Sequence, residues 1–412
     1  MSDLLSVDEA LTRILQDFQC LPAEASALES AHGRTLADDV IASHDLPPFA
    51  NSSMDGYAVR SDDVRTASQD APVRLRVAYD IPAGSTPTQP IQPGEVARIM
   101  TGAPMPPGAD AVVPVEQTDT PWRAGDDVAL ADTVAIYKAV HSGANVRYPG
   151  EDVRAGERVL TAGTRIRAAE MGVLAGLGEA RVSVVRKPRV ALLSSGDELL
   201  AVDEPLAPGK IRDMNSYTLA ALVTEGGGEA IRIPIARDRL EDVRSRFRQA
   251  LDMQPDIVLS SAGVSAGTAD LIRMVLDELG EVGFWKINLR PGKPLAYGKL
   301  DGVPFFGLPG NPVSAMVTFD VFVRPALLRL LGAPDLAQVT RALLAEDIAS
   351  DGRRSYIRVR LRDEGGRLIA TTTGTQSSGA LSSMVLADGL LIIPEDIMLA
   401  RAGETYPVRV LR

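Results

Sequence analysis

The alternation of strand-like and helix-like stretches between residues 188 and 331 constrains the fold of this chain more than any other feature. Short apolar runs predict strands at 189–193, 231–235, 256–260 and 303–306. Helical patterns predict helices at 215–225 with Asn215 as the cap, and at 240–251, 271–279 and 312–331. Such alternation indicates a mostly parallel sheet. Ligands of these sheets bind at the carboxyl ends of the strands, so we expect a ligand site there.

Two turns rich in Gly and Pro follow predicted strands of this region. The first is Arg290-Pro291-Gly292-Lys293-Pro294, and the second runs from Gly307 to Ser314 and opens a long apolar helix. Turns of this kind expose backbone N–H groups, and a helix N-terminus adds positive potential. Because Arg290 and Lys293 add two cations nearby, the sequence predicts an oxyanion site.

The remainder of the chain predicts further domains around this α/β core. We expect a multidomain α/β plus β protein with four parts: an elongated, discontinuous N-terminal domain (1–50 and 140–186), an inserted β-rich domain (51–139), the α/β domain (187–332) and a C-terminal β domain (333–412). Ser6 and Glu9 predict a capped first helix that stops at Leu21-Pro22. Its apolar stripe is expected to pack on a neighbouring domain or a second subunit. In the last domain, Gly365-Gly366 predicts a hairpin turn.

Composition excludes several classes of protein. The net charge of −11 and the lack of a basic run argue against nucleic-acid binding. Cys20 is the only cysteine, which excludes an intrachain disulfide and a multi-cysteine zinc site. No stretch is apolar over the roughly 18–20 residues that span a bilayer, and the amino terminus does not resemble a secretion signal. We therefore expect a cytoplasmic protein without membrane contact.

Acidic residues near predicted strand ends suggest a cation site. Asp55, Asp152, Glu198, Asp238 and Asp270 each adjoin a turn or a helix start, where any one of them alone is more simply a cap or a turn residue. Taken together, and beside bound phosphates, they favour Mg²⁺. The small residues of 260–267, which include Ser261, Gly263 and Ser265, suit contact with a phosphate or a ring system, and Thr101 offers a hydroxyl. The polar loop 373–379 is expected to be a solvated turn.

These motifs together resemble the molybdopterin molybdenumtransferases, the MoeA family, to which the gephyrin E domain belongs. The resemblance covers nearly the whole chain, through segments at 51–60, 98–117, 150–152, 195–199, 263–270, 291–294, 307–315 and 371–374. It implies insertion of molybdate into adenylylated molybdopterin with release of AMP, a requirement for Mg²⁺, and a homodimer whose active cleft is shared between subunits. The alternatives are a molybdopterin adenylyltransferase and a non-catalytic pterin-binding scaffold.

The resemblance also assigns roles to individual residues. Asp55, Thr101, Asp152, Glu198, Asp238 and Asp270 are expected to be catalytic, and Glu198, Asp238 and Asp270 to hold Mg²⁺. The expected substrate-binding residues are Ser261, Gly263, Ser265, Lys286, Arg290, Lys293, Pro294, Ser314, Arg358 and Ser378. Many members of the family have Lys where this chain has Arg290. The charge is the same, but the planar, forked guanidinium would meet an anion with a different geometry.

Overall fold

The chain folds into two compact units. The computed structural model describes residues 4–120, 129–261, 269–335 and 338–411, except for the side chains of Ala269 and Asp270. The first unit, called here the main unit, comprises residues 1–38, 163–167 and 181–412. The second, called here the inserted unit, comprises residues 39–162 and 168–180.

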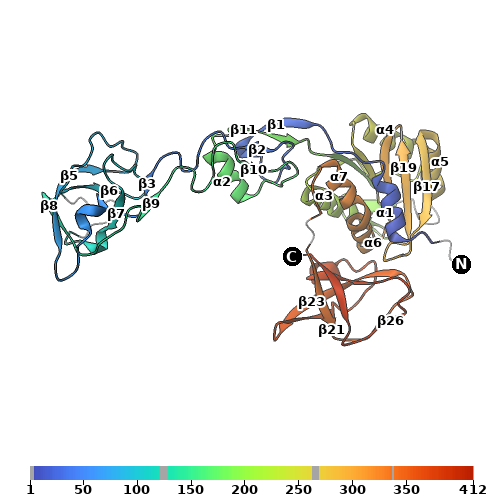
Figure 1. Cartoon of the computed structure of the whole chain (residues 1–412). Helices are drawn as coiled ribbons and strands as arrows, with labels where there is room; N and C mark the ends of the chain where they lie inside the picture. Colours follow the sequence, from blue (N-terminus) through green and yellow to red (C-terminus); the bar gives the residue numbers. More distant parts are fainter. Residues whose placement is uncertain (1–3, 121–128, 262–268, 336–337, 412) are drawn as a thin grey trace. The chain divides into compact units, whose positions relative to one another are not determined.

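The main unit contains a six-stranded sheet that is parallel over four strands. In spatial order its strands are β15 (Glu229–Arg232), β12 (Arg189–Leu193), β16 (Ile257–Ser260), β20 (Val303–Gly307), β19 (Pro294–Leu300) and β17 (Gly280–Lys286). The first four are parallel, and β19 and β17 extend the sheet antiparallel (Figure 1). The prediction of a mostly parallel sheet is confirmed, although the β17–β19 hairpin was not predicted. Strand β15 ends at Arg232 rather than at residue 235, because Pro234 has no N–H to continue the ladder.

Helices cover both faces of this sheet (Figure 1). One face packs against α1 (Val7–Leu15), α3 (Asn215–Glu225) and a long helix made of α6 (Pro312–Thr318), the π-helical segment η4 (Phe319–Val323) and α7 (Arg324–Leu330). The other face packs against α4 (Leu240–Asp252) and α5 (Ala269–Leu279). The four predicted helices are therefore present. Their apolar faces and the alternate faces of the strands form two core clusters, one on each side of the sheet.

Two predictions about helix ends were wrong. Helix α1 begins as predicted, since Ser6 Oγ accepts a hydrogen bond from the Glu9 N–H at 3.2 Å, but it ends at Leu15, six residues before Leu21. Phe18 lies beyond that end and is still buried with the sheet, so the stripe packs on the α/β domain. In α3 the N–H of Ser216 donates to Asp213, and Asn215 instead donates to the carbonyl oxygen of Gly310.

The C-terminal part of the main unit is a five-stranded barrel. Strand β23 (Arg354–Glu364) pairs with β24 (Arg367–Thr372), and the sheet continues through β21 (Val339–Leu344), β27 (Thr405–Val410) and β25 (Gly389–Ile393) back to β23. Glu364 pairs with Arg367 across the predicted Gly365-Gly366 turn, which is confirmed. Outside the barrel, β22 (Ile348–Ala349) pairs with β26 (Leu399–Ala400), and α8 (Ser382–Val385) precedes β25. Elsewhere in the main unit, β1 (Ala23–Ala27) pairs with β11 (Arg181–Val185).

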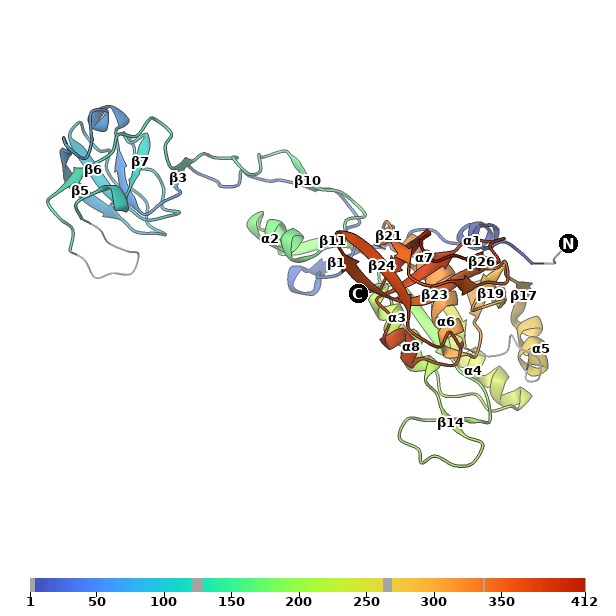
Figure 2. The ribbon, with the colours of Figure 1, turned by 90° about the horizontal axis from the view of Figure 1, so that it is seen from below.

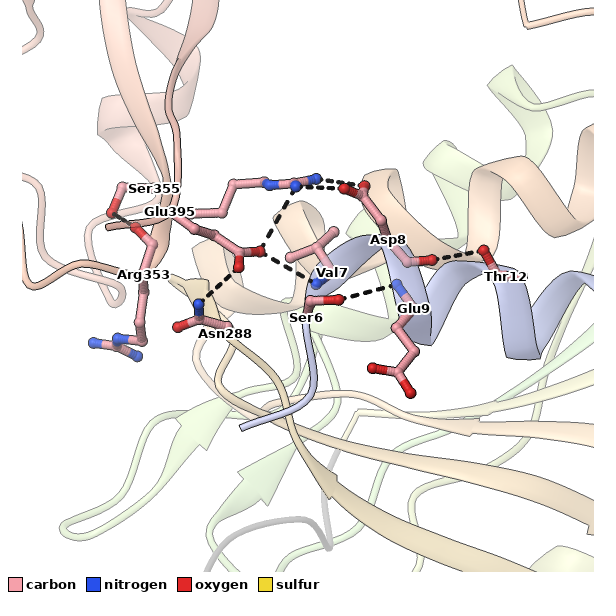
Figure 3. A network of polar contacts seen from close by, with 10 residues as sticks. Ser6, Val7, Asp8, Glu9, Thr12, Asn288, Arg353, Ser355 and Glu395 are labelled. Atoms are coloured by element: carbon pink, nitrogen blue, oxygen red, sulfur yellow. Dashed lines mark hydrogen bonds and ion pairs between the residues drawn. The ribbon is translucent and has the colours of Figure 1, made fainter. Parts of the chain in front are cut away.

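A network of polar contacts joins helix α1, the barrel and the segment before Arg290 (Figure 3). Arg354 at the start of β23 donates to both carboxylate oxygens of Asp8 at 2.7 Å. Glu395 accepts from Asn288 Nδ2 at 2.9 Å, accepts from the Val7 N–H at 3.4 Å, and lies 3.6 Å from Arg354. The hydrogen bonds to Arg354 lower the pKa of Asp8, which keeps this carboxylate charged.

We expect Glu395→Ala to lower the free energy of unfolding by about 1–3 kcal/mol, because Asn288 and Arg354 would each lose a charged partner in a half-buried position. Urea unfolding measures the change. The matched control is Glu364→Ala, at the exposed end of β23, which we expect to be neutral. Equal stability of the two variants would contradict a stabilising role for the network.

The inserted unit is a β domain followed by paired ribbons. Its five-stranded sheet has the order β7 (Ala111–Pro114), β4 (Gly56–Val59), β6 (Glu95–Ile99), β5 (Val73–Ile81) and β8 (Thr133–Ile136). Strands β7, β6 and β5 are labelled in Figure 2. Two ribbons pair early with late segments of the chain: β3 (Asn51–Ser52) with β9 (Val146–Arg147), and β2 (Val40–Ile41) with β10 (Arg158–Leu160). Helix α2 (Ala168–Gly176) follows. Early and late segments of this unit therefore pair with each other.

No helix within the described ranges is long and apolar enough to cross a bilayer.

Candidate oxyanion-binding site

The first of the two predicted turns is fixed between the sheet and the barrel. Residues Pro291 to Lys293 connect the short strand β18 (Leu289–Arg290) to β19. Strand β18 is not part of the α/β sheet. It pairs in parallel with β23, so that Arg290 lies opposite Ser355. Arg353 Nη1 also donates to the carbonyl oxygen of Leu289 at 3.1 Å. The turn therefore contacts two domains at once.

A pocket of about 280 Å³ opens at this junction. Four segments form its wall: the turn, the start of α6, β23 with the residue before it, and the loop after β24. The lining residues are Arg290, Pro291, Gly292, Lys293, Ser314, Arg353, Tyr356, Ile357, Arg358, Gln376 and Ser378. Four of these residues are cationic and none is acidic. The pocket therefore has the charge of an anion site, within a chain whose net charge is negative.

Arg358 on β23 is held rigidly in the pocket wall. Its side chain is only 1% exposed. Nε donates to Ser383 Oγ at 3.1 Å, and Nη2 donates to the carbonyl oxygens of Ser377 and Thr375 at 3.1 and 3.4 Å. Gln376 fixes the backbone of the same residue, because it accepts from the Arg358 N–H at 3.0 Å and donates to the Arg358 carbonyl oxygen at 3.1 Å. The side-chain bonds use Nε and Nη2, which form one edge of the guanidinium. The third nitrogen, Nη1, takes part in none of these hydrogen bonds.

The positive charge of this site is only partly offset by the protein, because the carboxylate of Asp351, which pairs with Arg353, also interacts with Arg290. Among the described residues, no carboxylate forms an ion pair with Arg290, Lys293 or Arg358, whereas Arg353 bonds to Asp351 at 3.1 Å. Burial lowers the pKa of Arg358, and the positive charge of Arg290 lowers it further. A buried cation without a counter-ion is costly. An oxyanion in the pocket would supply the missing charge.

The second predicted turn contributes less than expected. Ser314, which is 5% exposed, is its one pocket residue in the described part of the chain. The predicted free amides at the helix start are partly occupied, since the Val313 N–H donates to the carbonyl oxygen of Ser378 at 3.1 Å. Asn311 Nδ2 also donates to Ser378 Oγ at 3.0 Å. The barrel loop thus caps this helix, and the pocket draws more of its lining from the first turn than from the second.

Gly292 is required at the centre of the first turn. Its φ is +118°, in a region that side chains disfavour, and a Cβ there would overlap Thr318 Oγ1. We expect Gly292→Ala to lower the free energy of unfolding by about 1–3 kcal/mol, through backbone strain and this overlap.

Gly302→Ala is the matched control for Gly292→Ala. Gly302 has a φ of +85° but no atom within 4 Å of an added Cβ, so its variant isolates the cost of the backbone angle. Urea unfolding of both variants gives the difference. A smaller loss for Gly292→Ala than for Gly302→Ala would contradict the close contact with Thr318.

Five of the predicted substrate-binding residues meet in the pocket, namely Arg290, Lys293, Ser314, Arg358 and Ser378. Lys286 and Pro294 lie opposite each other on β17 and β19, outside the lining. Ser261 is buried at the end of β16, where its hydroxyl lies 3.1 Å from that of Ser194. Gly263 and Ser265 lie outside the described residues.

The predicted acids of the main unit lie at the carboxyl ends of β12 and β15. Asp238 Oδ2 accepts from the Asp197 N–H at 3.1 Å, and Asp197 Oδ1 accepts from the Asp238 N–H at 3.2 Å. Glu198 is adjacent and exposed. Asp270 lies in the first turn of α5, but its side chain is outside the description. The described side chains contain no group of three acidic, His or Cys residues that could hold a metal. The Asp197–Asp238 pair supplies oxygen donors that fit a Mg²⁺ ion retaining several waters.

The predicted site residues of the inserted unit are only partly brought together. Asp55 Oδ1 accepts from both the N–H and the hydroxyl of Thr101, at 2.7 and 2.8 Å. This bond holds the carboxylate in place beside the start of β4. Asp152 is exposed, its N–H donates to the Leu46 carbonyl oxygen at 3.0 Å, and no described hydrogen bond connects it to Asp55.

Several pocket residues were not predicted from the sequence. Tyr356 lies two residues before Arg358 on β23, and residues two apart on a strand point to the same face, so this spacing could have identified it. Gln376 lies in the loop 373–379, in which Ser378 alone was predicted to bind substrate, and it also lines the pocket. Arg353 and Gly292 carry no sequence signal for this role beyond their nearness to the motifs.

Three family descriptions match successive parts of the chain. They are the "MoeA N-terminal region (domain I and II)" at residues 5–178, the "probable molybdopterin binding domain" at 191–329, and the "MoeA C-terminal region (domain IV)" at 341–411. The order of the three matches follows the order of the structural parts, with a β insertion, an α/β core and a terminal barrel.

Named relatives resemble the whole chain. Molybdopterin molybdenumtransferase 2 of Mycobacterium tuberculosis H37Rv is 40% identical over 395 residues, which cover 92% of this chain and 93% of the relative. The molybdopterin molybdenumtransferase of Bacillus subtilis is 33% identical over 411 residues, with coverage of 99% and 94%. The crystal structure of the molybdopterin biosynthesis MoeA protein from Pyrococcus horikoshii OT3 superposes with a TM-score of 0.81 at 31% identity, and covers 99% of this chain and 100% of that one.

The fold and these relatives thus define a multidomain transferase of molybdenum cofactor biosynthesis. The chain belongs to the molybdopterin molybdenumtransferase (MoeA) family. The resemblance inferred from the sequence motifs is confirmed.

Proposed function

We propose that this enzyme inserts molybdate into adenylylated molybdopterin and releases AMP in a Mg²⁺-dependent reaction. The observation that supports this proposal most strongly is the buried guanidinium of Arg358, which lines the pocket together with Arg290 and forms no ion pair with a described carboxylate. Molybdate is a small dianion, and a pocket of about 280 Å³ has room for it beside part of a larger substrate.

In this proposal the protein acts mainly by positioning. Arg358 binds the oxyanion through the Nη1 edge that its other hydrogen bonds leave open, Arg290 and Lys293 contribute charge, and Ser314 and Ser378 contribute hydroxyls. Because the guanidinium is already oriented by Ser383 and Gln376, little reorganisation accompanies anion binding. The bound molybdate is thereby held next to the dithiolene sulfurs that it must join.

We propose that Glu198, Asp238 and Asp270, together with the neighbouring Asp197, hold Mg²⁺ near the nucleotide. When bound, the ion would neutralise charge on the phosphoanhydride. Asp197 and Asp238 keep their carboxylates adjacent through reciprocal backbone hydrogen bonds, which supports this assignment.

The proposed assembly is a cytoplasmic homodimer with an active cleft shared between subunits. Asp55, Thr101 and Asp152 would act in that cleft. The bonds from Thr101 that immobilise the Asp55 carboxylate support a role in which its orientation matters. Ser261, Gly263, Ser265, Lys286 and Pro294 remain proposed contacts of the pterin or its phosphate.

A reconstituted reaction tests the function. Purified protein, adenylylated molybdopterin, molybdate and Mg²⁺ are mixed, and AMP and molybdenum-containing product are quantified together. We expect equal amounts of both, with dependence on molybdate. Consumption of ATP with free molybdopterin, and no metal insertion, would identify an adenylyltransferase instead. Pterin binding without either reaction at any molybdate concentration would identify a scaffold.

A further inference from the structure

Thr318 carries a buried hydroxyl that the free protein does not use. It is the last residue of α6 and is 0% exposed. Its Oγ1 has no hydrogen-bond partner among the described residues. Threonines in helices commonly donate to the carbonyl oxygen four residues earlier, but Thr318 does not. Unpaired buried hydroxyls are rare and costly, so this group calls for a partner in another state of the protein.

The unpaired hydroxyl of Thr318 lies directly against the turn from Arg290 to Lys293. A Cβ built on Gly292 would overlap Thr318 Oγ1, so the oxygen is next to the Cα of Gly292. Ser314, one helical turn earlier on the same face of α6, lines the pocket. Helical hydrogen bonding changes to the π pattern at Phe319, immediately after Thr318, and such changes recur at functional sites. Thr318 therefore lies beside the Arg290–Lys293 turn and one helical turn from a residue that lines the pocket.

The turn from Arg290 to Lys293 has backbone N–H groups that a hydrogen bond from Thr318 could orient. In the described part of the chain, neither the Gly292 N–H nor the Lys293 N–H donates a hydrogen bond. The φ of +118° at Gly292 lies in a region where only glycine moves freely. In a trans peptide the carbonyl and the N–H point in opposite directions. If the Gly292 carbonyl faces Thr318, the Lys293 N–H faces away from it.

We propose that Thr318 is a positioning residue for oxyanion binding. With the anion bound, Thr318 Oγ1 donates a hydrogen bond to the Gly292 carbonyl oxygen, and the same peptide directs the Lys293 N–H at the anion. This inference rests on the proposed function of the pocket. It adds a backbone donor to the cationic side chains and explains why a hydroxyl is buried without a partner.

Thr318→Val tests the proposal, because it removes the hydroxyl and keeps the shape of the side chain. We expect the melting temperature to be unchanged or higher, since the lost hydroxyl has no partner in the free protein. The KM for molybdate is expected to rise about tenfold, with kcat at saturating molybdate within about twofold of the wild type. Thr318→Ser retains the hydroxyl and is expected to keep the wild-type KM within about twofold.

The outcomes separate this inference from the proposed function. An unchanged KM in Thr318→Val, together with a raised KM in Arg358→Met, would overturn the role of Thr318 and leave the oxyanion site standing. An unchanged KM in both variants would overturn both. If Thr318→Val does not fold, wild-type crystals soaked with molybdate decide the question. Thr318 Oγ1 within hydrogen-bond distance of the Gly292 carbonyl oxygen supports the proposal, and a greater separation contradicts it.

Discussion

Arg358→Met is expected to abolish molybdate use while it leaves the fold intact. The substitution keeps an unbranched side chain in a site that is 1% exposed, and it removes a buried charge that has no counter-ion among the described residues. We expect kcat/KM for molybdate to fall roughly 100- to 1000-fold, the loss typical of removing a preorganised electrostatic donor. The free energy of unfolding should fall by no more than about 2 kcal/mol, because removing an uncompensated buried cation partly offsets the loss of its hydrogen bonds to Ser383, Ser377 and Thr375.

Two further variants make this result specific. Arg360 lies two residues further along the same strand and its side chain is exposed, so the Arg360→Met variant should have wild-type activity. Arg358→Lys keeps the charge but loses the forked geometry, so we expect only partial activity. Wild-type molybdate dependence in a folded Arg358→Met protein would refute the assignment of the pocket to the oxyanion.

Asp270→Asn is expected to block AMP release without unfolding the protein. Asp270 lies in the first turn of α5, and this helix follows β16, whose neighbour β12 leads to Asp197 and Glu198. The carboxyl ends of these parallel strands meet at one edge of the sheet, and we propose that Asp197, Glu198 and Asp270 act together there. Replacing a carboxylate by an amide weakens a Mg²⁺ site, and we expect at least a roughly 100-fold slower release of AMP.

The matched control is Asp277→Asn, in the last turns of the same helix, where the carboxylate is exposed and lies 4.0 Å from Arg273. It should release AMP at the wild-type rate. AMP formation and its dependence on Mg²⁺ concentration are measured for both variants. If Asp270→Asn releases AMP normally with the usual Mg²⁺ dependence, the proposed metal role of this acid is wrong.

The elements that depend on local pattern could be predicted from the sequence. Strand β12 is a short apolar run, the helix from Pro312 has a proline in its first turn, and Gly365-Gly366 fits a hairpin turn. The cationic turn was also predicted correctly, because Arg290 and Lys293 are close in sequence and flank a glycine. In each case the residues that decide the structure are neighbours in the chain.

What could not be predicted depends on contacts between distant segments. The family resemblance named Arg358, but its burial and its hydrogen bonds with Ser383 and Gln376 could not be predicted, because nothing in an alternating strand marks one of its arginines as buried. The start of α6 suggested free amides, but Ser378, more than sixty residues later, accepts the Val313 N–H. The role proposed for Thr318 likewise depends on Gly292, which contacts it only in the folded chain.

The most direct test of the central claim is a crystal of this protein soaked with AMP, Mg²⁺ and molybdate, with anomalous diffraction data collected at the molybdenum edge. We expect one molybdenum peak in the pocket between the Arg290–Lys293 turn and β23, with Arg358 Nη1 within hydrogen-bond distance of a molybdate oxygen. A molybdenum peak elsewhere, with the Arg358 pocket empty at saturating molybdate, would contradict the account.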